Sequence, residues 1–213
     1  MPKYRQDSDH KYGNNTIIFD AARDGDSELL EFLLMTKRFD VNAKDPYGRT
    51  VLGSAAREER CIGLLLATER INVNCQDSLG QTAIFMPAIG GRLQVVQLLL
   101  ATAGFLPDLK DNSGRTALSY AAGTWKEQAE TVEALLHSER VDSDARDQDG
   151  RTPFSYASER GHGRVMQLLV DTGKVSVDSR DSRGLTCLKW YRRGCLDRND
   201  ETLPYTDLFQ VAN

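Results

Sequence analysis

Apolar residues along the chain recur in short stripes with helical spacing, and polar turns separate these stripes. Residues 29–34, 95–100 and 165–170 each place leucine, valine or methionine along one helix face. A shorter segment with small residues precedes each stripe, as at Ala21 and Ala22. Because the apolar face of a short helix must be buried against another element, the pattern predicts antiparallel helix pairs joined by turns.

A motif of the form D-x-x-G-x-T recurs between the predicted helix pairs. Its copies occupy residues 45–50, 77–82, 111–116, 147–152 and 181–186, and a weaker copy ends at Thr16. Successive threonines of the six copies are 34, 32, 34, 36 and 34 residues apart. A period in the thirties indicates a solenoid of stacked repeats. The sequence therefore predicts about five repeats and a degenerate sixth.

Each residue of the motif has a physical role. Gly150 follows Asp147 by three residues, where a tight turn often needs the positive φ that glycine adopts freely. The side-chain oxygens of Asp147 and Thr152 can accept hydrogen bonds from backbone N–H groups in a turn or a first helical turn. Pro153 suits the first turn of a helix, because its missing N–H needs no partner there. The motif predicts a tight turn that leads directly into a helix.

These residues resemble the ankyrin repeat, whose pattern is close to D-x-x-G-x-T-P-L-x-x-A-A, a G-H turn and V-V-x-L-L-L. Residues 147–154 together with Gly161 and His162 match this pattern best. The copies, residues 171–178 among them, are similar to the arrays common in filamentous fungi. The resemblance implies an all-α solenoid of stacked helix-turn-helix units with short turn hairpins.

The resemblance covers roughly residues 14–195 and leaves a polar N-terminal leader at 1–13 and a C-terminal tail or cap at 196–213. The sixth copy departs from the pattern, because Tyr191 and Arg192 replace its alanine pair and residues 197–204 do not continue as a second helix. Terminal repeats are commonly atypical because one side faces water. The histidine that usually follows T-x-L is also replaced throughout, by Phe19, Gly53, Phe85, Ser119, Ser155 and Lys189.

Composition and charge narrow the classes of function. The formal net charge is -4, both signs are mixed along the chain and no basic run occurs, so we expect no direct nucleic-acid binding. No apolar stretch approaches the roughly 20 residues of a membrane span, and the first ten residues lack the apolar core of a secretory signal. We therefore expect a cytoplasmic or nuclear protein, and a monomer.

The sequence contains no recognisable set of catalytic or metal-binding residues. The four cysteines, Cys61, Cys75, Cys187 and Cys195, are irregularly spaced and suit reduced thiols. No histidine pairs with them at zinc-site spacing, and His162 fills the G-H turn that the resemblance assigns to structure. We expect no metal, no cofactor and no enzymatic activity.

The resemblance implies instead that a partner protein binds the concave side, which the turn tips and first helices form. The outward positions are the two residues before the turn glycine, the one after it and the pair following the alanines. In this chain they are Tyr47, Arg49, Arg57, Glu58, Leu79, Gln81, Ile89, Asn112, Ser113, Arg115, Asp149, Arg151, Glu159, Arg160, Arg183 and Arg193.

Two sets of equivalent residues stand out among the repeats. Arginines at positions 49, 115 and 151 can form a basic row for an acidic segment, although solvated charges are the simpler interpretation. The aromatic residues Tyr120, Tyr156 and Trp190 can offer contacts to a partner, although packing between adjacent repeats is the simpler interpretation. The sequence leaves both alternatives open.

Repeats two to four also carry a cluster of irregularities. Repeat two is shortened around residues 57–61, Pro87 lies within the first helix of repeat three, and repeat four is lengthened around residues 123–128. An internal proline removes a helical hydrogen bond, so we expect a kink or an early end at Pro87. Trp125 lies in the lengthened turn and is a candidate anchor for a partner; neutral drift is the simpler interpretation.

Three functional hypotheses follow from the sequence. The first is an intracellular adaptor or regulatory protein, such as a transcriptional coregulator, that acts by protein binding. The second is the recognition array of a larger signalling protein, suggested by the irregular sixth repeat. The third is an unusual enzyme that binds a small molecule near Pro87 and Trp125.

Overall fold

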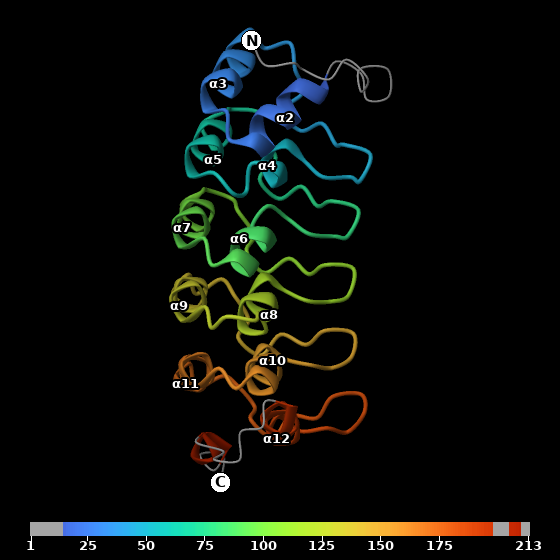
Figure 1. Ribbon diagram of the computed structural model, residues 1–213, viewed down its shortest axis with the longest axis vertical. Helices are drawn as coiled ribbons and strands as arrows, with labels where there is room; N and C mark the ends of the chain where they lie inside the picture. Colours follow the sequence, from blue (N-terminus) through green and yellow to red (C-terminus); the bar gives the residue numbers. More distant parts are fainter. Residues whose placement is uncertain (1–14, 198–204, 210–213) are drawn as a thin grey trace.

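The computed structural model describes residues 15–197 and 205–209, which form a stack of helix pairs (Figure 1). The first helices of the pairs are α2 (Thr16–Asp24), α4 (Val51–Ser54), α6 (Phe85–Gly90), α8 (Ala117–Ala122) and α10 (Pro153–Arg160). The second helices are α3 (Ser27–Thr36), α5 (Glu59–Leu66), α7 (Leu93–Ala101), α9 (Ala129–His137) and α11 (Gly163–Asp171). Helix α12 (Cys187–Asp197) and the 3-10 helix η2 (Thr206–Phe209) complete the described stack.

The threonines of the repeats set where most first helices begin. The side chain of Thr116 accepts a hydrogen bond from the backbone N–H of Ser119, and Thr50 caps α4 in the same way. Thr152 forms a reciprocal capping box with Ser155. The side chain of Ser155 therefore caps the helix, and that of Ser119 contacts the hydroxyl of Thr116, at two positions where the family pattern usually has histidine.

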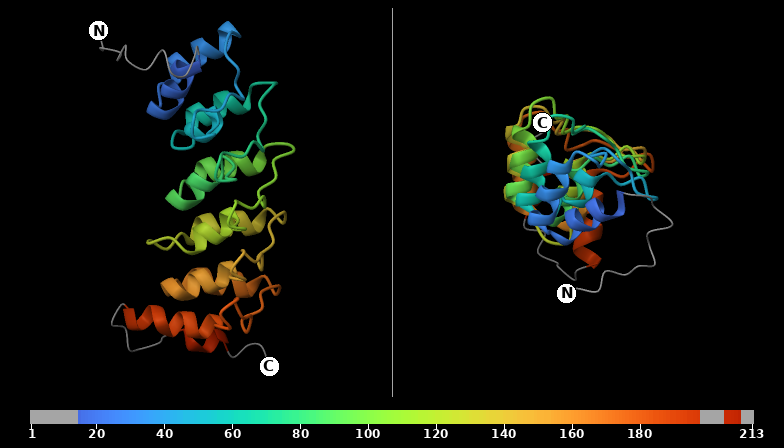
Figure 2. Two further views of the ribbon diagram at one scale, coloured as in Figure 1. Left: turned by 90° about the vertical axis from the view of Figure 1, so that its right-hand side faces the viewer. Right: turned by 90° about the horizontal axis from the view of Figure 1, so that it is seen from above.

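The core lies between the helix pairs and continues along the whole stack. Each second helix contributes one apolar side chain at the same repeat position with no solvent exposure: Leu30, Ile62, Val96, Val132 and Met166. Figure 2 shows that the layers follow one another in sequence order, so each repeat contacts its sequence neighbours. This arrangement is the solenoid predicted from the period of the motif.

The D-x-x-G-x-T motifs form tight turns that project from one side of the stack (Figure 1). Gly150 has a φ of 74°, as the motif predicts. Backbone hydrogen bonds join neighbouring turns: the N–H of Asn112 donates to Leu79 and that of Gln148 donates to Ser113. Within the described residues, extended pairing is limited to isolated bridges, one of which joins Lys44 and Thr50.

The prediction that Pro87 kinks its helix or ends it early is wrong. Helix α6 begins at Phe85 instead of directly after Thr82, so Pro87 is its third residue. Backbone N–H groups in the first helical turn have no intrahelical partner, and the carbonyl of Ala83 lies outside the helix, where the proline ring does not clash with it. The helix ends as in other repeats, at Gly91 with a φ of 62°. Proline therefore delays the start of α6 and leaves its end unchanged.

The sixth repeat consists of a long first helix, against which η2 packs. Helix α12 has eleven residues, and Tyr191, which replaces an alanine, is only 1% exposed. The ring of Phe209 in η2 packs against Phe154 and Tyr191, with centroid separations of 5.6 Å in both cases. Most of the segment expected to lack a helix, residues 198–204, lies outside the described residues.

Candidate protein-binding face

The turn tips and the first helices form one side of the stack, which we call the tip-and-helix face (Figure 1). Every residue that the sequence predicts for partner contact keeps part of its surface accessible. The exposed ones are Tyr47, Arg49, Arg57, Glu58, Leu79, Asn112, Ser113, Trp125, Asp149, Arg183 and Arg193. The half-buried ones are Gln81, Ile89, Arg115, Arg151, Glu159 and Arg160.

The aspartate that opens each turn uses its two carboxylate oxygens differently. Oδ1 of Asp111 accepts hydrogen bonds from the backbone N–H groups of Ser113 and Arg115 and so closes the turn. Oδ2 of Asp111 accepts from the hydroxyl of Tyr120, four residues after the repeat threonine, at 2.9 Å. The turn and its helix are therefore linked through one carboxylate.

The same link recurs in the next two repeats. The hydroxyl of Tyr156 donates to Oδ2 of Asp147 at 2.5 Å, and the indole Nε1 of Trp190 donates to Oδ2 of Asp181 at 3.0 Å. Burial of Tyr156, followed by its hydrogen bond to Asp147, raises the pKa of the phenol above its ordinary value. The hydroxyl therefore stays protonated as the donor.

Arginine guanidinium groups lie between these aromatic rings. The guanidinium carbon of Arg115 is 5.5 Å from the ring centroid of Tyr120 and 4.8 Å from that of Tyr156. Arg151 is 4.0 Å from both Tyr156 and Trp190. We call this alternation of rings and guanidinium groups, made of Tyr120, Arg115, Tyr156, Arg151 and Trp190, the cation–π column.

The cation–π column changes the interpretation of both sequence-predicted rows. Tyr156 and Trp190 are 8% and 4% exposed, so packing between repeats is confirmed for these two aromatics. The Arg151 side chain is 12% exposed and pairs with Glu159 at 2.5 Å, whereas that of Arg49 is 49% exposed. The three arginines therefore do not present an even basic row.

The tip-and-helix face is hollow where the cation–π column is absent. Repeat two has Ser54 at the position of Tyr120 and Tyr156, and a cleft of about 510 Å³ opens beside it. Residues from α2, the first turn and α4 line this cleft: Asn15, Thr16, Phe19, Asp20, Arg23, Lys44, Asp45, Pro46, Tyr47, Arg49 and Ser54. Small residues in repeat two thus leave space that aromatic rings fill in later repeats.

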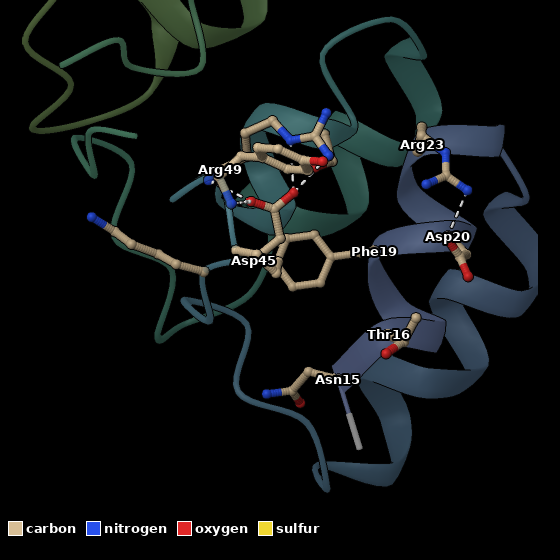
Figure 3. A pocket seen from close by; sticks show the side chains of 11 residues that line it. Asn15, Thr16, Phe19, Asp20, Arg23, Asp45 and Arg49 are labelled. Atoms are coloured by element: carbon tan, nitrogen blue, oxygen red, sulfur yellow. Dashed lines mark hydrogen bonds and ion pairs between the residues drawn. The ribbon is translucent and has the colours of Figure 1, made fainter. Parts of the chain in front are cut away.

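Charged and aromatic side chains meet in this cleft (Figure 3). Arg49 holds the carboxylate of Asp45 through Nε at 2.7 Å and through its terminal nitrogen at 2.6 Å. Arg23 pairs with Asp20 at 2.6 Å on the side formed by α2. The ring of Tyr47, 69% exposed, stands at the rim with Arg49 5.1 Å from its centroid.

Exposed apolar side chains continue from the cleft to repeat three. Leu79, at the tip of the next turn, is 60% exposed, and Met86 on α6 is 45% exposed. Met86 also lines a small cavity of about 50 Å³ beside Arg49 and Gln81. Repeats two and three therefore carry exposed apolar groups on the tip-and-helix face.

Trp125 projects from the lengthened turn between α8 and α9 and is 88% exposed. The guanidinium of Arg160 lies 4.1 Å from its ring centroid, and Nε of Arg160 donates to the carbonyl of Gly123. Glu127 of the same turn accepts a hydrogen bond from the backbone N–H of Val165 in the next repeat. The turn is therefore braced against repeat five while its indole faces solvent.

The histidine and cysteine side chains do not have the environment of reactive groups. Nδ1 of His162 lies 3.1 Å from the carbonyl oxygen of Ala122 in the preceding repeat, which fits the structural role expected for the G-H turn. Burial raises the pKa of the Cys61 thiol and raises that of Cys187 to about 11, opposite to the change that activates a nucleophile. In the described part of the chain, no group of three or more His, Cys, Asp or Glu residues has the arrangement of a metal site.

The stacked helix pairs with turn hairpins define a helical solenoid of short repeats, and comparison with known families gives its class. The family model for ankyrin repeats in three copies matches residues 57–143 and 124–192. The chain belongs to the ankyrin repeat family. A search of curated proteins finds no match for the chain. None of the described helices is long and apolar enough to cross a lipid bilayer.

The cleft in repeats one and two is the part of the face that the sequence prediction missed. Asp20, Asp45 and Ser54 line it, and none of them was among the predicted contact residues. A signal was present in the sequence, because Ser54 stands where later repeats have tyrosine or tryptophan. A small residue among bulky equivalents indicates unfilled space.

Proposed function

We propose that the chain is a non-catalytic binding module that recognises a partner protein through its tip-and-helix face. Ankyrin repeats generally mediate protein–protein interaction, which supports this class of function. The observation that carries the proposal is the uneven surface of the face: a cleft of about 510 Å³ with exposed Tyr47 at its rim and Leu79 at the next turn tip. Exposed apolar groups beside a cleft are typical of interaction sites.

The proposal includes an adaptor or regulatory role in the cytoplasm or the nucleus, and a transcriptional coregulator is one form of it. A recognition array within a larger signalling protein would use the same face in the same way. The alternative of an enzyme site between Pro87 and Trp125 has little support. Pro87 is buried, and Trp125 is 88% exposed, so its side chain does not enclose a cavity.

A pair of matched surface variants tests the proposal. The double variant Tyr47→Ser/Leu79→Ser removes two exposed apolar groups from the tip-and-helix face. The control Met35→Ser removes an apolar group that is 76% exposed on α3, a second helix on the opposite side of the layer (Figure 1). Each variant is used as the bait in an affinity purification from the native cells, and mass spectrometry identifies the bound proteins. The melting temperature of each bait is measured first, to show that it is folded.

The proposal expects a partner that the wild type and Met35→Ser retain and that the double variant loses. A partner that binds the double variant as well as the wild type would contradict it. Native mass spectrometry of the same purified protein addresses the enzyme alternative, because a small molecule that copurifies in place of any protein partner would favour that alternative.

A further inference from the structure

We propose that the cleft beside Ser54 is a slot for a tyrosine or tryptophan side chain of the partner. This inference rests on the proposed protein-binding function and names the chemistry that its central site recognises. It follows from a comparison of repeat two with repeats four, five and six of the same chain. In those repeats the equivalent space holds an aromatic ring that carries a hydrogen-bond donor.

The ring in repeats four to six always meets the same acceptor. Tyr120, Tyr156 and Trp190 stand four residues after the repeat threonine, and each donates to Oδ2 of the aspartate that opens its turn, at 2.5 to 3.0 Å. The other oxygen of that aspartate is occupied by the backbone of the turn. One carboxylate oxygen is therefore presented to the ring position in each of these repeats.

Repeat two contains the acceptor without the ring. Oδ1 of Asp45 accepts from the backbone N–H groups of Tyr47 and Arg49, and Oδ2, the oxygen that meets the ring in later repeats, is contacted by Nε and a terminal nitrogen of Arg49. The residue at the ring position is Ser54, which is half-buried and donates its hydroxyl to the carbonyl of Thr50. The ring position is therefore empty, and Arg49 holds the acceptor oxygen that the ring uses in later repeats.

Two residues beside the slot stand at the repeat positions of the two arginines that flank Tyr156, and one of the two is again an arginine. That ring lies between Arg115 and Arg151, which immediately precede the threonines of two successive repeats. In the cleft the two equivalent residues are Asn15 and Arg49. Arg49 is the cation available on one side, and its half-exposed side chain has room to move from Asp45 onto an incoming ring.

Repeat two differs from repeat three in this respect. The ring position of repeat three holds Met86, and only about 50 Å³ remains free beside it. The cleft of about 510 Å³ in repeats one and two can take a complete aromatic side chain together with adjoining partner backbone. Because the rim carries exposed Tyr47, the incoming residue would be surrounded on several sides.

A direct binding experiment uses amino-acid amides as probes for the partner side chain. N-acetyl-L-tyrosinamide and N-acetyl-L-phenylalaninamide are titrated into the ¹⁵N-labelled full chain and followed by NMR. We expect the tyrosine probe to shift the signals of Asp45, Arg49 and Ser54 with a dissociation constant on the order of 1 mM. The phenylalanine probe lacks the donor and should bind about tenfold more weakly.

The variant Ser54→Tyr fills the slot with the ring that later repeats already have. We expect it to fold with an unchanged or higher melting temperature and to lose binding of the tyrosine probe. A Met35→Tyr variant adds the same ring at an exposed position of α3, on the opposite side of the layer, and should leave probe binding unchanged. If Ser54→Tyr fails to fold, Asp45→Asn offers a second test, because it should weaken the tyrosine probe and spare the phenylalanine probe.

Failure of this inference can be distinguished from failure of the proposed function. Equal binding of both probes, or a tyrosine probe that binds Ser54→Tyr as well as the wild type, would overturn the slot. A protein partner that requires the tip-and-helix face but binds Ser54→Tyr normally would also overturn the slot and leave the proposed function intact. If Ser54→Tyr abolishes the binding of both the tyrosine probe and the protein partner, the result would support the slot and the proposed function.

Discussion

The guanidinium carbon of Arg151 lies 4.0 Å from the ring centroid of Trp190, a residue of the next repeat. The same carbon lies 4.0 Å from the ring centroid of Tyr156, within its own repeat. The buried Nε of Arg151 has no hydrogen-bond partner, so the two rings are its nearest aromatic contacts in place of a polar acceptor. A charged side chain therefore joins two repeats through stacking, in addition to its ion pair with Glu159.

The change Arg151→Gln should destabilise the fold by about 2 to 3 kcal/mol, because desolvated cation–π contacts are worth about 2 kcal/mol or more. The control Arg49→Gln removes the equivalent arginine of repeat two, which is about half exposed, and should change the free energy of unfolding within about 0.5 kcal/mol. Urea denaturation of both variants provides the comparison. Equal midpoints would show that the cation–π column contributes little.

The turn glycines allow a second test of the repeat geometry. Gly150 has a φ of 74°, and a Cβ added there would lie 3.3 Å from the backbone nitrogen of Ser182. Gly150→Val should therefore lower the free energy of unfolding by about 1 to 3 kcal/mol. Gln148→Ala changes an exposed side chain of the same turn and should matter within about 0.5 kcal/mol. Indistinguishable denaturant midpoints would contradict the positive φ.

The sequence was sufficient to predict the repeats because a period of about 34 residues and a helical apolar pattern act locally. It did not predict the position of α6, which begins at Phe85 and not directly after Thr82, because Pro87 is accommodated only in the first helical turn. Oγ1 of Thr82 is consequently buried without a hydrogen-bond partner. Nor did the sequence predict the stacking of Arg115 and Arg151. Their guanidinium groups contact the rings of Tyr156 and Trp190 because neighbouring repeats stack in the folded protein, which the sequence of a single repeat does not show.

Trp125 remains the candidate anchor at the other end of the first helices. Because its side chain is 88% exposed, Trp125→Ala should leave the free energy of unfolding unchanged within about 0.5 kcal/mol. If the partner uses this indole, the variant should lose about 2 kcal/mol of binding energy even at high salt. Urea denaturation measures the stability, and isothermal titration calorimetry at two salt concentrations measures the affinity.

The control for Trp125 must be an exposed arginine. Arg115 is unsuitable, because its stacking on Tyr120 and Tyr156 makes the change Arg115→Ala destabilising as well. Arg57 is exposed, and Arg57→Ala should weaken binding at low salt alone. Unchanged affinity of a folded Trp125→Ala protein would remove Trp125 from the binding face.

Asp108 occupies a repeat position that asparagine holds in earlier repeats. Nδ2 of Asn74 donates to the carbonyl of Gly104 at 2.8 Å, and its Oδ1 accepts from the N–H of Leu106 at 2.8 Å. Asn42 makes the same pair of bonds one repeat earlier. Asparagine at this position therefore both donates to and accepts from the backbone of the next repeat.

The carboxylate of Asp108 can accept from that backbone but cannot donate to it. Its buried Oδ1 has no hydrogen-bond partner. Burial, together with the nearby negative charge of Asp142, raises the pKa of Asp108 to about 6, although a hydrogen bond from the Asp142 backbone opposes the rise. The folded state therefore holds a proton on Asp108 more tightly than the unfolded chain does. Its contribution to stability is largest below about pH 4 and is lost as the pH rises through about 6.

Replacing Asp108 with asparagine should restore the missing donor. Because the site is only partly buried, we expect Asp108→Asn to raise the free energy of unfolding at pH 7 by about 1 to 2 kcal/mol, less than the full shift in pKa implies. The advantage should shrink as the pH falls from 6 to 4, where the wild-type carboxyl becomes protonated and can donate itself. Asp149→Asn, at an exposed turn tip, removes the same charge and should shift stability within about 0.5 kcal/mol at either pH. Urea unfolding at pH 4, 5, 6 and 7 measures the difference, and a constant gap between Asp108→Asn and the wild type across this range would rule out the carboxylate as its cause.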